Sequence, residues 1–226
     1  MVGGFVRDEL LGVKSKDVDF AVEAESYEAM RDDILSRGYT IFIEKPEFFT
    51  IRGKHPQYGG VDFVLCRKDG YYTDGRRPDN VEVGTIYDDL ARRDFTVNAI
   101  AKTEDGEYID PHGGQEDLQR MLLRCVGDTD KRLTEDYLRI LRALRFKITK
   151  GFEFDDELYA AMDDPNITKG LLTIPIERIY EELKRCYDFN TWDTMLWLQY
   201  LSEIRHVIFY ERRLSLTPVI NYSRVK

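Results

Sequence analysis

Residues 1–22 read MVGGFVRDELLGVKSKDVDFAV, and the second half of this stretch carries two aspartates one residue apart. The run "VDFAV" is typical of a β-strand, in which alternate side chains point to the same face. Asp17 and Asp19 therefore share a face, with Phe20 on the other. Two neighbouring carboxylates repel each other unless a cation lies between them, and hard oxygen ligands suit Mg²⁺. The pattern indicates a magnesium site.

The first half of the stretch offers groups that bind phosphate. Gly3 and Gly4 allow backbone amides to approach a ligand, and the turn after them favours a helix N-terminus. Arg7 adds a guanidinium fork, with Asp8 beside it. The alternative is an ordinary Gly-Gly turn followed by a surface pair of aspartates, and the spacing alone leaves both interpretations open.

A third acid, Asp62, lies inside the apolar run "GGVDFVLCR" at 59–67. A charged residue in a strand is costly unless the strand lies at a sheet edge or the charge serves a site. Asp62 is therefore either a further metal ligand or an outward-facing aspartate.

Composition limits the class of protein. The 226 residues are 42% hydrophobic and 33% charged, which is typical of a globular chain with one large or two small domains. The net charge of −9 argues against a general nucleic-acid binder, although a whole-chain charge can hide local basic patches. No apolar run approaches the ~20 residues of a membrane span. Three widely spaced cysteines favour a reducing, cytoplasmic location.

The hydrophobic pattern changes along the chain. Up to about residue 118 it predicts strands over 18–22, 39–44, 48–53, 61–67 and 107–111. A helix over 26–37 interrupts them, with Ser26 as its N-cap and Gly38 at its end. From about residue 116 the spacing predicts helices over 116–124, 134–146 and 175–187.

Further motifs follow in the same order along the chain. "RRDFTVNA" occupies 92–99, "DPHGG" occupies 110–114, and Thr134 is the expected N-cap of the helix over 134–146. Leucines 138, 141 and 144 line one side of that helix. A second row steps by three and comprises Asp136, Arg139, Arg142 and Arg145. Such a row is a solvated face with ion pairs or a binding surface.

In this order, the motifs resemble those of the class II tRNA nucleotidyltransferase and bacterial poly(A) polymerase family: "GGFVRD", "DVD", "RRDFTVNA", "DPHGG", "EDYLRILRA" and "IERIYEELKR". The resemblance implies an α+β fold with a polymerase-β-like nucleotidyltransferase head, a mixed sheet with flanking helices, over residues 1–118. An all-α neck that recognises the base would cover 119–186, and a short helical remnant of the body domain would cover 187–226. We expect an N- and C-terminally short version of the family.

The resemblance also implies roles for individual residues. Asp17, Asp19 and Asp62 would be the catalytic acids and would bind Mg²⁺, two ions in this family. The implied nucleotide-binding residues are Gly3, Gly4, Arg7, Asp8, Arg92, Arg93, Asp94, Asn98, Asp136, Arg139, Arg142 and Arg145. Asp136 and Arg139 would read the base, because a carboxylate accepts from the amino group of cytosine or adenine and a guanidinium donates to ring nitrogens.

A segment between Asp62 and the "RRDFTVNA" motif, "DGRR", is linked in the family to addition of the terminal A, which makes Asp74, Gly75, Arg76 and Arg77 a predicted flexible loop. The resulting prediction is template-independent addition of CCA to the tRNA 3′ end from CTP and ATP. One alternative is an A-adding enzyme or a poly(A) polymerase. Another is a catalytically weak module that binds RNA or protein. With few groups to hold distal tRNA, the chain is expected to form a homo-oligomer or to bind tRNA weakly.

Overall fold

The computed structural model describes residues 1–14, 18–56, 59–71 and 79–216. The chain divides into two compact units. The head unit comprises the described residues up to Arg120, and the helical unit comprises the described residues from Met121 onward. The predicted metal ligand Asp17 and the predicted loop 74–77 lie outside the described residues.

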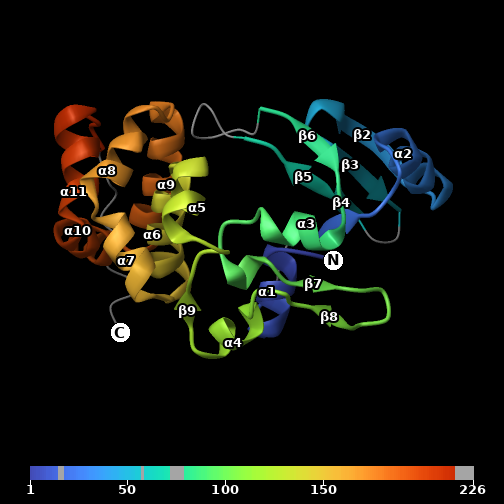
Figure 1. The fold of residues 1–226 in the computed structure, drawn as a ribbon, viewed down its shortest axis with the longest axis horizontal. Coiled ribbons are helices and arrows are strands. Elements are labelled where there is room, and N and C mark those ends of the chain that lie inside the picture. Colours follow the sequence, from blue (N-terminus) through green and yellow to red (C-terminus); the bar gives the residue numbers. More distant parts are fainter. Residues whose placement is uncertain (15–17, 57–58, 72–78, 217–226) are drawn as a thin grey trace. The chain divides into compact units, whose positions relative to one another are not determined.

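Within the described residues, the head unit is built on a mixed four-stranded sheet with the order β1-β4-β3-β2 (Figure 1). Strand β1 (Asp19–Val22) runs parallel to β4 (Gly59–Leu65). Strand β4 is antiparallel to β3 (Thr50–His55), which in turn is antiparallel to β2 (Thr40–Lys45). These four strands lie where the sequence predicts them.

Helix α2 (Tyr27–Ser36) covers one face of this sheet and closes its hydrophobic core. Met30 and Ile34 of the helix pack with Ile51 and Phe63 of the sheet, and all four are buried. The predicted N-cap is confirmed, because the Ser26 hydroxyl accepts a 3.1 Å hydrogen bond from the Ala29 amide. Gly38 follows the helix with φ 85°, a conformation that favours glycine.

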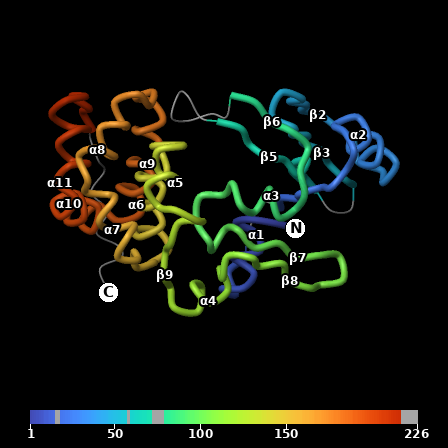
Figure 2. The backbone as a smooth tube through the Cα atoms, in the orientation of Figure 1, coloured from blue at the N-terminus to red at the C-terminus, as the bar shows by residue number. Residues whose placement is uncertain are grey.

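The first two residues lie between two strands of the head unit. The Val2 amide donates to the Asp19 carbonyl at 2.9 Å, and the Lys102 amide donates to the Met1 carbonyl at 2.8 Å. Figure 2 shows the N-terminus beside the hairpin of β7 (Ala101–Lys102) and β8 (Tyr108–Ile109), part of the predicted 107–111 strand. The Gly-Gly turn and α1 (Gly4–Leu10) are thereby placed next to the start of β1.

The rest of the head unit consists of short elements. They are the 3₁₀ turn Pro46–Phe48, the antiparallel hairpin of β5 (Arg67–Asp69) and β6 (Val81–Val83), helix α3 (Ile86–Ala91), the 3₁₀ turn η2 (Thr96–Asn98) and helix α4 (Gly114–Gln119). The sequence pattern did not predict α3. Its N-terminus is a capping box, in which Thr85 and Asp88 satisfy each other's backbone amides.

The helical unit begins with the short strand β9 (Leu122–Leu123), which pairs in parallel with β10 (Glu153–Phe154). Its helices are α5 (Thr129–Glu135), α6 (Leu138–Lys150), α7 (Asp156–Met162), α8 (Pro165–Thr168), α9 (Ile176–Phe189), α10 (Thr191–Tyr200) and α11 (Ser202–Arg205). A 3₁₀ segment, Lys169–Leu172, and a π-helical segment, His206–Glu211, complete it. Nowhere in the described part of the chain is a helix both long and apolar enough to cross a membrane.

Two sequence predictions in this region are wrong in part. The helix predicted over 116–124 ends at Gln119, and Leu122–Leu123 form β9 instead. The helix predicted over 134–146 is two helices separated at Asp136, whose backbone is extended (φ −147°, ψ 98°). Thr134 is therefore not an N-cap but lies inside α5, where its hydroxyl donates to the Asp130 carbonyl at 2.8 Å.

The break has a local cause in the aspartate side chain. Asp136 Oδ1 accepts a 3.0 Å hydrogen bond from the Leu138 amide, so the carboxylate replaces a helical backbone partner. Asp136 thus stands just ahead of α6 rather than on its face with Arg139, Arg142 and Arg145. The predicted apolar side of the helix is confirmed, since leucines 138, 141 and 144 are buried.

Candidate active site

Two acids of the sheet face each other across neighbouring strands. Asp19 of β1 is in register with Asp62 of β4, and Asp62 is in register with Arg52 of β3. Neighbouring strands lie about 4.8 Å apart, so residues in register are adjacent. Because Ile51 and Phe63 point towards α2, alternation places Asp62 and Arg52 on the opposite face. Sequence and structure agree in bringing these two acids together.

The donor set suits a divalent cation of the Mg²⁺ type, because carboxylate oxygens are hard ligands and two carboxylates lie in register on adjacent strands. Asp62 Oδ1 also lies 3.1 Å from Arg52 Nε, and this ion pair is open to solvent. Among the described residues, which exclude Asp17, no group of three or more histidine, cysteine, aspartate or glutamate side chains could hold a metal ion. A role for Asp19 and Asp62 as metal ligands stays a prediction.

Gly3 lies at the point where this site meets α1. Its φ of 68° favours glycine, and a Cβ atom built on it would lie 2.7 Å from Arg93 Nη1 and 3.9 Å from Asp19 Oδ2. Any side chain here would displace the guanidinium. The missing side chain of Gly3 thus allows Arg93 to reach the neighbourhood of the Asp19 carboxylate.

Four other predicted nucleotide-binding residues bond to one another inside the head unit. Arg7 donates from Nε to Asp8 Oδ1 at 2.9 Å and from Nη1 to Asn98 Oδ1 at 2.6 Å. Asn98 Nδ2 in turn donates to Asp94 Oδ1 at 2.9 Å. All four side chains are buried, so the network fixes α1 against η2. A direct contact of these residues with a nucleotide stays a prediction.

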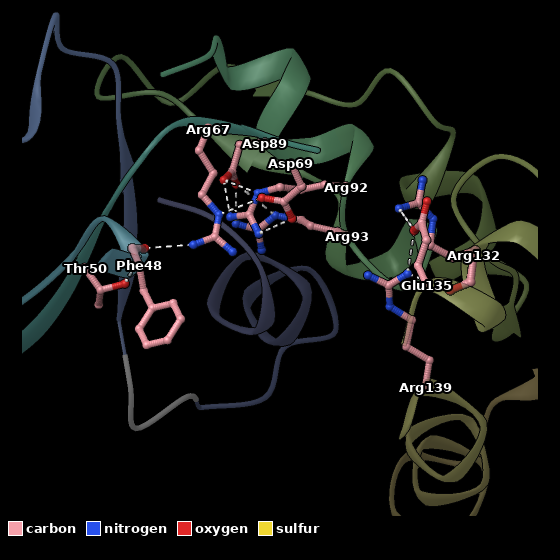
Figure 3. Close-up of polar contacts among 10 residues, drawn as sticks. All are labelled: Phe48, Thr50, Arg67, Asp69, Asp89, Arg92, Arg93, Arg132, Glu135 and Arg139. Atoms are coloured by element: carbon pink, nitrogen blue, oxygen red, sulfur yellow. Dashed lines mark hydrogen bonds and ion pairs between the residues drawn. The ribbon is translucent and has the colours of Figure 1, made fainter. Parts of the chain in front are cut away.

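The arginine pair that opens the "RRDFTVNA" motif, Arg92 and Arg93, is held by one aspartate (Figure 3). Asp89 is completely buried, and its two oxygens bind different arginines. Oδ1 accepts from Arg92 Nη2 at 2.5 Å, and Oδ2 accepts from Arg93 Nη2 at 2.8 Å. Burial by itself raises the pKa of Asp89, but Arg93 and Arg92 together lower it below its ordinary value of 3.8. Asp89 is therefore an ionised anchor.

A second acid extends the cluster towards the β5–β6 hairpin. Asp69 of β5 lies 2.9 Å from Arg67 Nε through Oδ1 and 3.6 Å from Arg92 Nη1 through Oδ2. Arg67 Nη1 also donates to the Phe48 carbonyl at 2.8 Å. Alternating charges thus connect the β5 strand with the arginine pair (Figure 3).

The sequence interpretation missed Asp89 and Asp69. The spacing offered a signal for Asp89, because it precedes Arg92 by three residues and Arg93 by four, the separations of neighbours on a helix. No comparable signal marks Asp69, since its contact with Arg92 joins a strand to the end of α3.

The predicted base-reading residues lie at the start of α6 in the helical unit. Glu135 Oε2 accepts from Arg132 Nη1 at 2.8 Å and from Arg139 Nη1 at 3.0 Å (Figure 3). Arg139 Nη1 also donates to the Arg132 carbonyl at 2.6 Å. Glu135, which the sequence interpretation assigned no role, therefore orients Arg139, while Asp136 precedes it at the helix break.

Arg145 is committed to a contact between helices. Its Nε donates to Glu182 Oε2 of α9 at 2.5 Å, and its guanidinium lies 5.1 Å from the ring centre of Phe146. Glu182 is buried, so the ion pair fastens α6 to α9. Arg142 is half-buried on α6. A role for either arginine in binding triphosphate stays a prediction.

The mixed sheet with flanking helices, followed by a helical region, is the architecture of an α+β nucleotidyltransferase head. The sequence profile of the Poly A polymerase head domain matches residues 1–124, more than half of the 226-residue chain. The chain therefore belongs to the family of CCA-adding enzymes and poly(A) polymerases that carries this head domain.

Curated relatives support the assignment. The chain is 38% identical over 190 residues to a CCA-adding enzyme of Leuconostoc mesenteroides, and the aligned region covers 81% of this chain and 44% of the relative. It is 34% identical over 239 residues to a CCA-adding enzyme of Oceanobacillus iheyensis, covering 99% of this chain and 57% of the relative. The chain thus spans about half the length of these relatives.

Solved structures share the fold. The CCA-adding enzyme of Bacillus stearothermophilus in complex with CTP gives a TM-score of 0.69 at 32% identity, over 82% of this chain and 43% of that one. The Thermotoga maritima CCA-adding enzyme in complex with tRNA gives a TM-score of 0.73 at 26% identity, and the match covers 96% of this chain and 49% of that one. A tRNA nucleotidyltransferase in complex with a primer tRNA and an ATP analogue gives a TM-score of 0.68 at 30% identity, and the match covers 90% of this chain and 58% of that one.

Proposed function

We propose that this chain catalyses template-independent addition of C and A nucleotides to the 3′ end of tRNA, using CTP and ATP and releasing pyrophosphate. The observation that carries the proposal is the pair Asp19 and Asp62, in register on adjacent strands beside Gly3 and Arg93. The named relatives are CCA-adding enzymes, and structures of similar proteins were solved with CTP, with tRNA and with an ATP analogue.

Asp19 and Asp62, together with Asp17, would hold Mg²⁺, with two ions implied by the family. When bound, the metal supplies charge that lowers the pKa of the RNA 3′-hydroxyl and stabilises the leaving pyrophosphate. Carboxylates are required for this role because an amide cannot balance the charge of a divalent ion.

The chain's own cations would bind the triphosphate. In the reaction, the RNA 3′-hydroxyl would lose its proton to water as its oxygen bonds to the α-phosphorus. The bond between the α-phosphorus and the oxygen that bridges it to the β-phosphorus would break, and pyrophosphate would leave with that electron pair. Arg93 lies beside Gly3, close to Asp19, where negative charge would gather. A guanidinium suits this task because it presents several donors to phosphate oxygens.

The base would be read in the helical unit. Arg139, oriented by Glu135, can donate to ring nitrogens of cytosine or adenine, and Asp136 can accept from their amino groups. Uracil and guanine present a carbonyl in place of the amino group and would leave the Asp136 carboxylate opposite an acceptor. The triad Glu135, Asp136 and Arg139 thus supports the C and A specificity.

Labelled-nucleotide incorporation tests the proposal. Three tRNAs are used, ending at the discriminator base, at C and at CC, each with CTP and ATP together and, in separate reactions, with each of the four nucleotides alone. The proposal expects CCA, CA and A as products, none of them with Asp19→Asn. Incorporation of A alone would identify an A-adding or poly(A)-forming enzyme instead. No incorporation on any RNA, with tRNA still bound, would leave a binding module and overturn the proposal.

The arrangement of the whole chain follows from the same proposal. Residues 1–118 would form the catalytic head, 119–186 the neck, and 187–226 a short part of the body. Contacts of arginines with tRNA phosphates would make tRNA binding by this chain salt-sensitive. Binding titrations at two salt concentrations test this expectation, and light scattering tests the predicted self-association.

A cytoplasmic location completes the proposal. Its support is the state of the cysteines, since Cys66, Cys125 and Cys186 are all buried thiols. Burial raises the pKa of the Cys66 thiol to about 12, which keeps it protonated and unreactive at neutral pH.

A further inference from the structure

One carboxylate of the head unit holds two guanidinium groups in a fixed pair. Arg92 and Arg93 each make two hydrogen bonds to Asp89, from Nε and from Nη2. Without a carboxylate between them, two guanidinium groups at this separation would repel each other. Asp89 is fully buried, so its charge is shielded from water and acts on both arginines at full strength.

The geometry gives one of the two arginines a direction. Arg93 Nη1 donates to the Asn98 carbonyl at 3.3 Å and lies where a Gly3 side chain would otherwise be. That position is beside the Asp19 carboxylate. A guanidinium has five N–H donors, more than its contacts with Asp89 and Asn98 use, so Arg93 retains capacity for an anion.

From these contacts we infer that Asp89 is a positioning residue for the phosphate groups of the incoming nucleoside triphosphate, acting through Arg92 and Arg93. The inference rests on the proposed function, because that function supplies the triphosphate. The cluster joins three guanidinium groups, those of Arg67, Arg92 and Arg93, to two carboxylates, those of Asp69 and Asp89, and therefore keeps a net positive charge. Since Asp89 holds the pair in advance, little side-chain entropy is lost when phosphate binds.

The test compares binding of CTP and CMP to the full chain by equilibrium dialysis. Asp89→Asn should weaken CTP binding about 10-fold or more, the effect of charge-assisted hydrogen bonds, and CMP binding less than about 3-fold. Asp88→Asn is the matched control. This neighbouring aspartate is half-buried and bonds to Thr85 instead of the arginines, so both affinities should stay unchanged.

A double-mutant cycle separates positioning from a general structural role. If Asp89 acts through the arginines, Asp89→Asn should have little further effect on CTP binding when Arg92→Gln and Arg93→Gln are already present. An undiminished effect in that background would overturn the inference. Equal losses for CTP and CMP in the single variant would overturn it too, because a structural defect does not distinguish triphosphate from monophosphate.

Failure of the inference and failure of the proposed function are distinguishable. A wild-type chain that binds no CTP removes both. A wild-type chain that binds CTP, with Asp89→Asn unchanged in its preference for CTP over CMP, removes only the inference. If circular dichroism shows that Asp89→Asn does not fold, the double variant Asp89→Asn/Arg92→Gln takes its place in the comparison of CTP with CMP binding. This variant removes one charge of each sign and leaves Arg93 beside a neutral amide.

Discussion

The head unit and the helical unit both hold arginines against a carboxylate at helical spacing, but they do so at different depths. Asp89 precedes its two arginines by three and four residues and is 0% exposed. Glu135 follows Arg132 by three and precedes Arg139 by four, and its side chain is 15% exposed. Water reaches the carboxylate of the second cluster and not that of the first, so it screens the charge of Glu135 more than that of Asp89. The same local spacing therefore produces a rigid anchor in one unit and a weaker contact in the other.

The surroundings of the two clusters differ as well. In the head unit, Asp69 of β5 adds a second carboxylate to Arg92, so the arginine pair is tied to the sheet as well as to α3. In the helical unit, Glu135, Arg132 and Arg139 all come from one short stretch, 132–139. Tertiary contacts thus reinforce the head cluster, whereas the other is mostly local.

The largest expected effect comes from the acid next to the head cluster. Asp19→Asn should lower nucleotide incorporation about 10⁴-fold while the fold is retained, because an amide cannot balance a divalent ion. Incorporation of labelled CTP and the melting temperature are measured together, with Asp105→Asn, an exposed aspartate of the head unit, as control. Incorporation near the wild-type level would remove Asp19 from the metal site.

The second-largest expected effect tests how strongly the buried carboxylate of Asp89 stabilises the head unit. Asp89→Asn should lower the free energy of unfolding by about 3–5 kcal/mol, because it removes the buried anion that two partly buried arginines share. The folded-state pKa of Asp89 lies below 3.8, so its stabilisation is present above about pH 4 and is lost as the pH falls through the folded pKa. Urea unfolding at pH 7 and pH 3 should show a difference between wild type and variant that shrinks on acidification. A constant difference would contradict this reading.

A smaller effect concerns base choice in the helical unit. Asp136→Ala removes the acceptor for the amino group of cytosine or adenine, and selection against UTP and GTP should weaken by about 1–3 kcal/mol. Competition among the four nucleotides at equal concentration measures the ratio. If the preference for C and A persisted, Asp136 would have no part in recognition, and only the head cluster would retain a functional role.

The smallest effect sharpens the contrast in burial. Glu135→Gln should cost only about 1 kcal/mol of unfolding free energy, because the carboxylate is partly exposed and its ion pairs are screened. Urea unfolding of this variant beside Asp89→Asn gives the comparison on one scale. Equal losses in the two variants would show that burial does not separate the clusters.

Several features of the fold could be read from the residues themselves. Strands β1 to β4 follow the alternation of apolar side chains, and Ser26 with Gly38 marks both ends of α2. These succeed because they depend on neighbours within one element. The prediction of one helix over 134–146 was wrong because the Leu138 amide bonds to the Asp136 side chain and interrupts the helix. This hydrogen bond is also local, but the spacing of apolar residues gives no sign of it.

By itself, the sequence determined the family, the acids and the arginines, because motif order and residue chemistry are properties of the chain. Only the tertiary structure decided what those groups contact. Asp19 meets Asp62 because two strands that are neighbours in the sheet are separated in the sequence by α2, β2 and β3, and Arg145 meets Glu182 across two helices. Asp89 looked like one more acid in a charged stretch until folding buried it between two guanidinium groups. Burial is a property of the packed chain, and it is burial that makes a carboxylate a strong anchor.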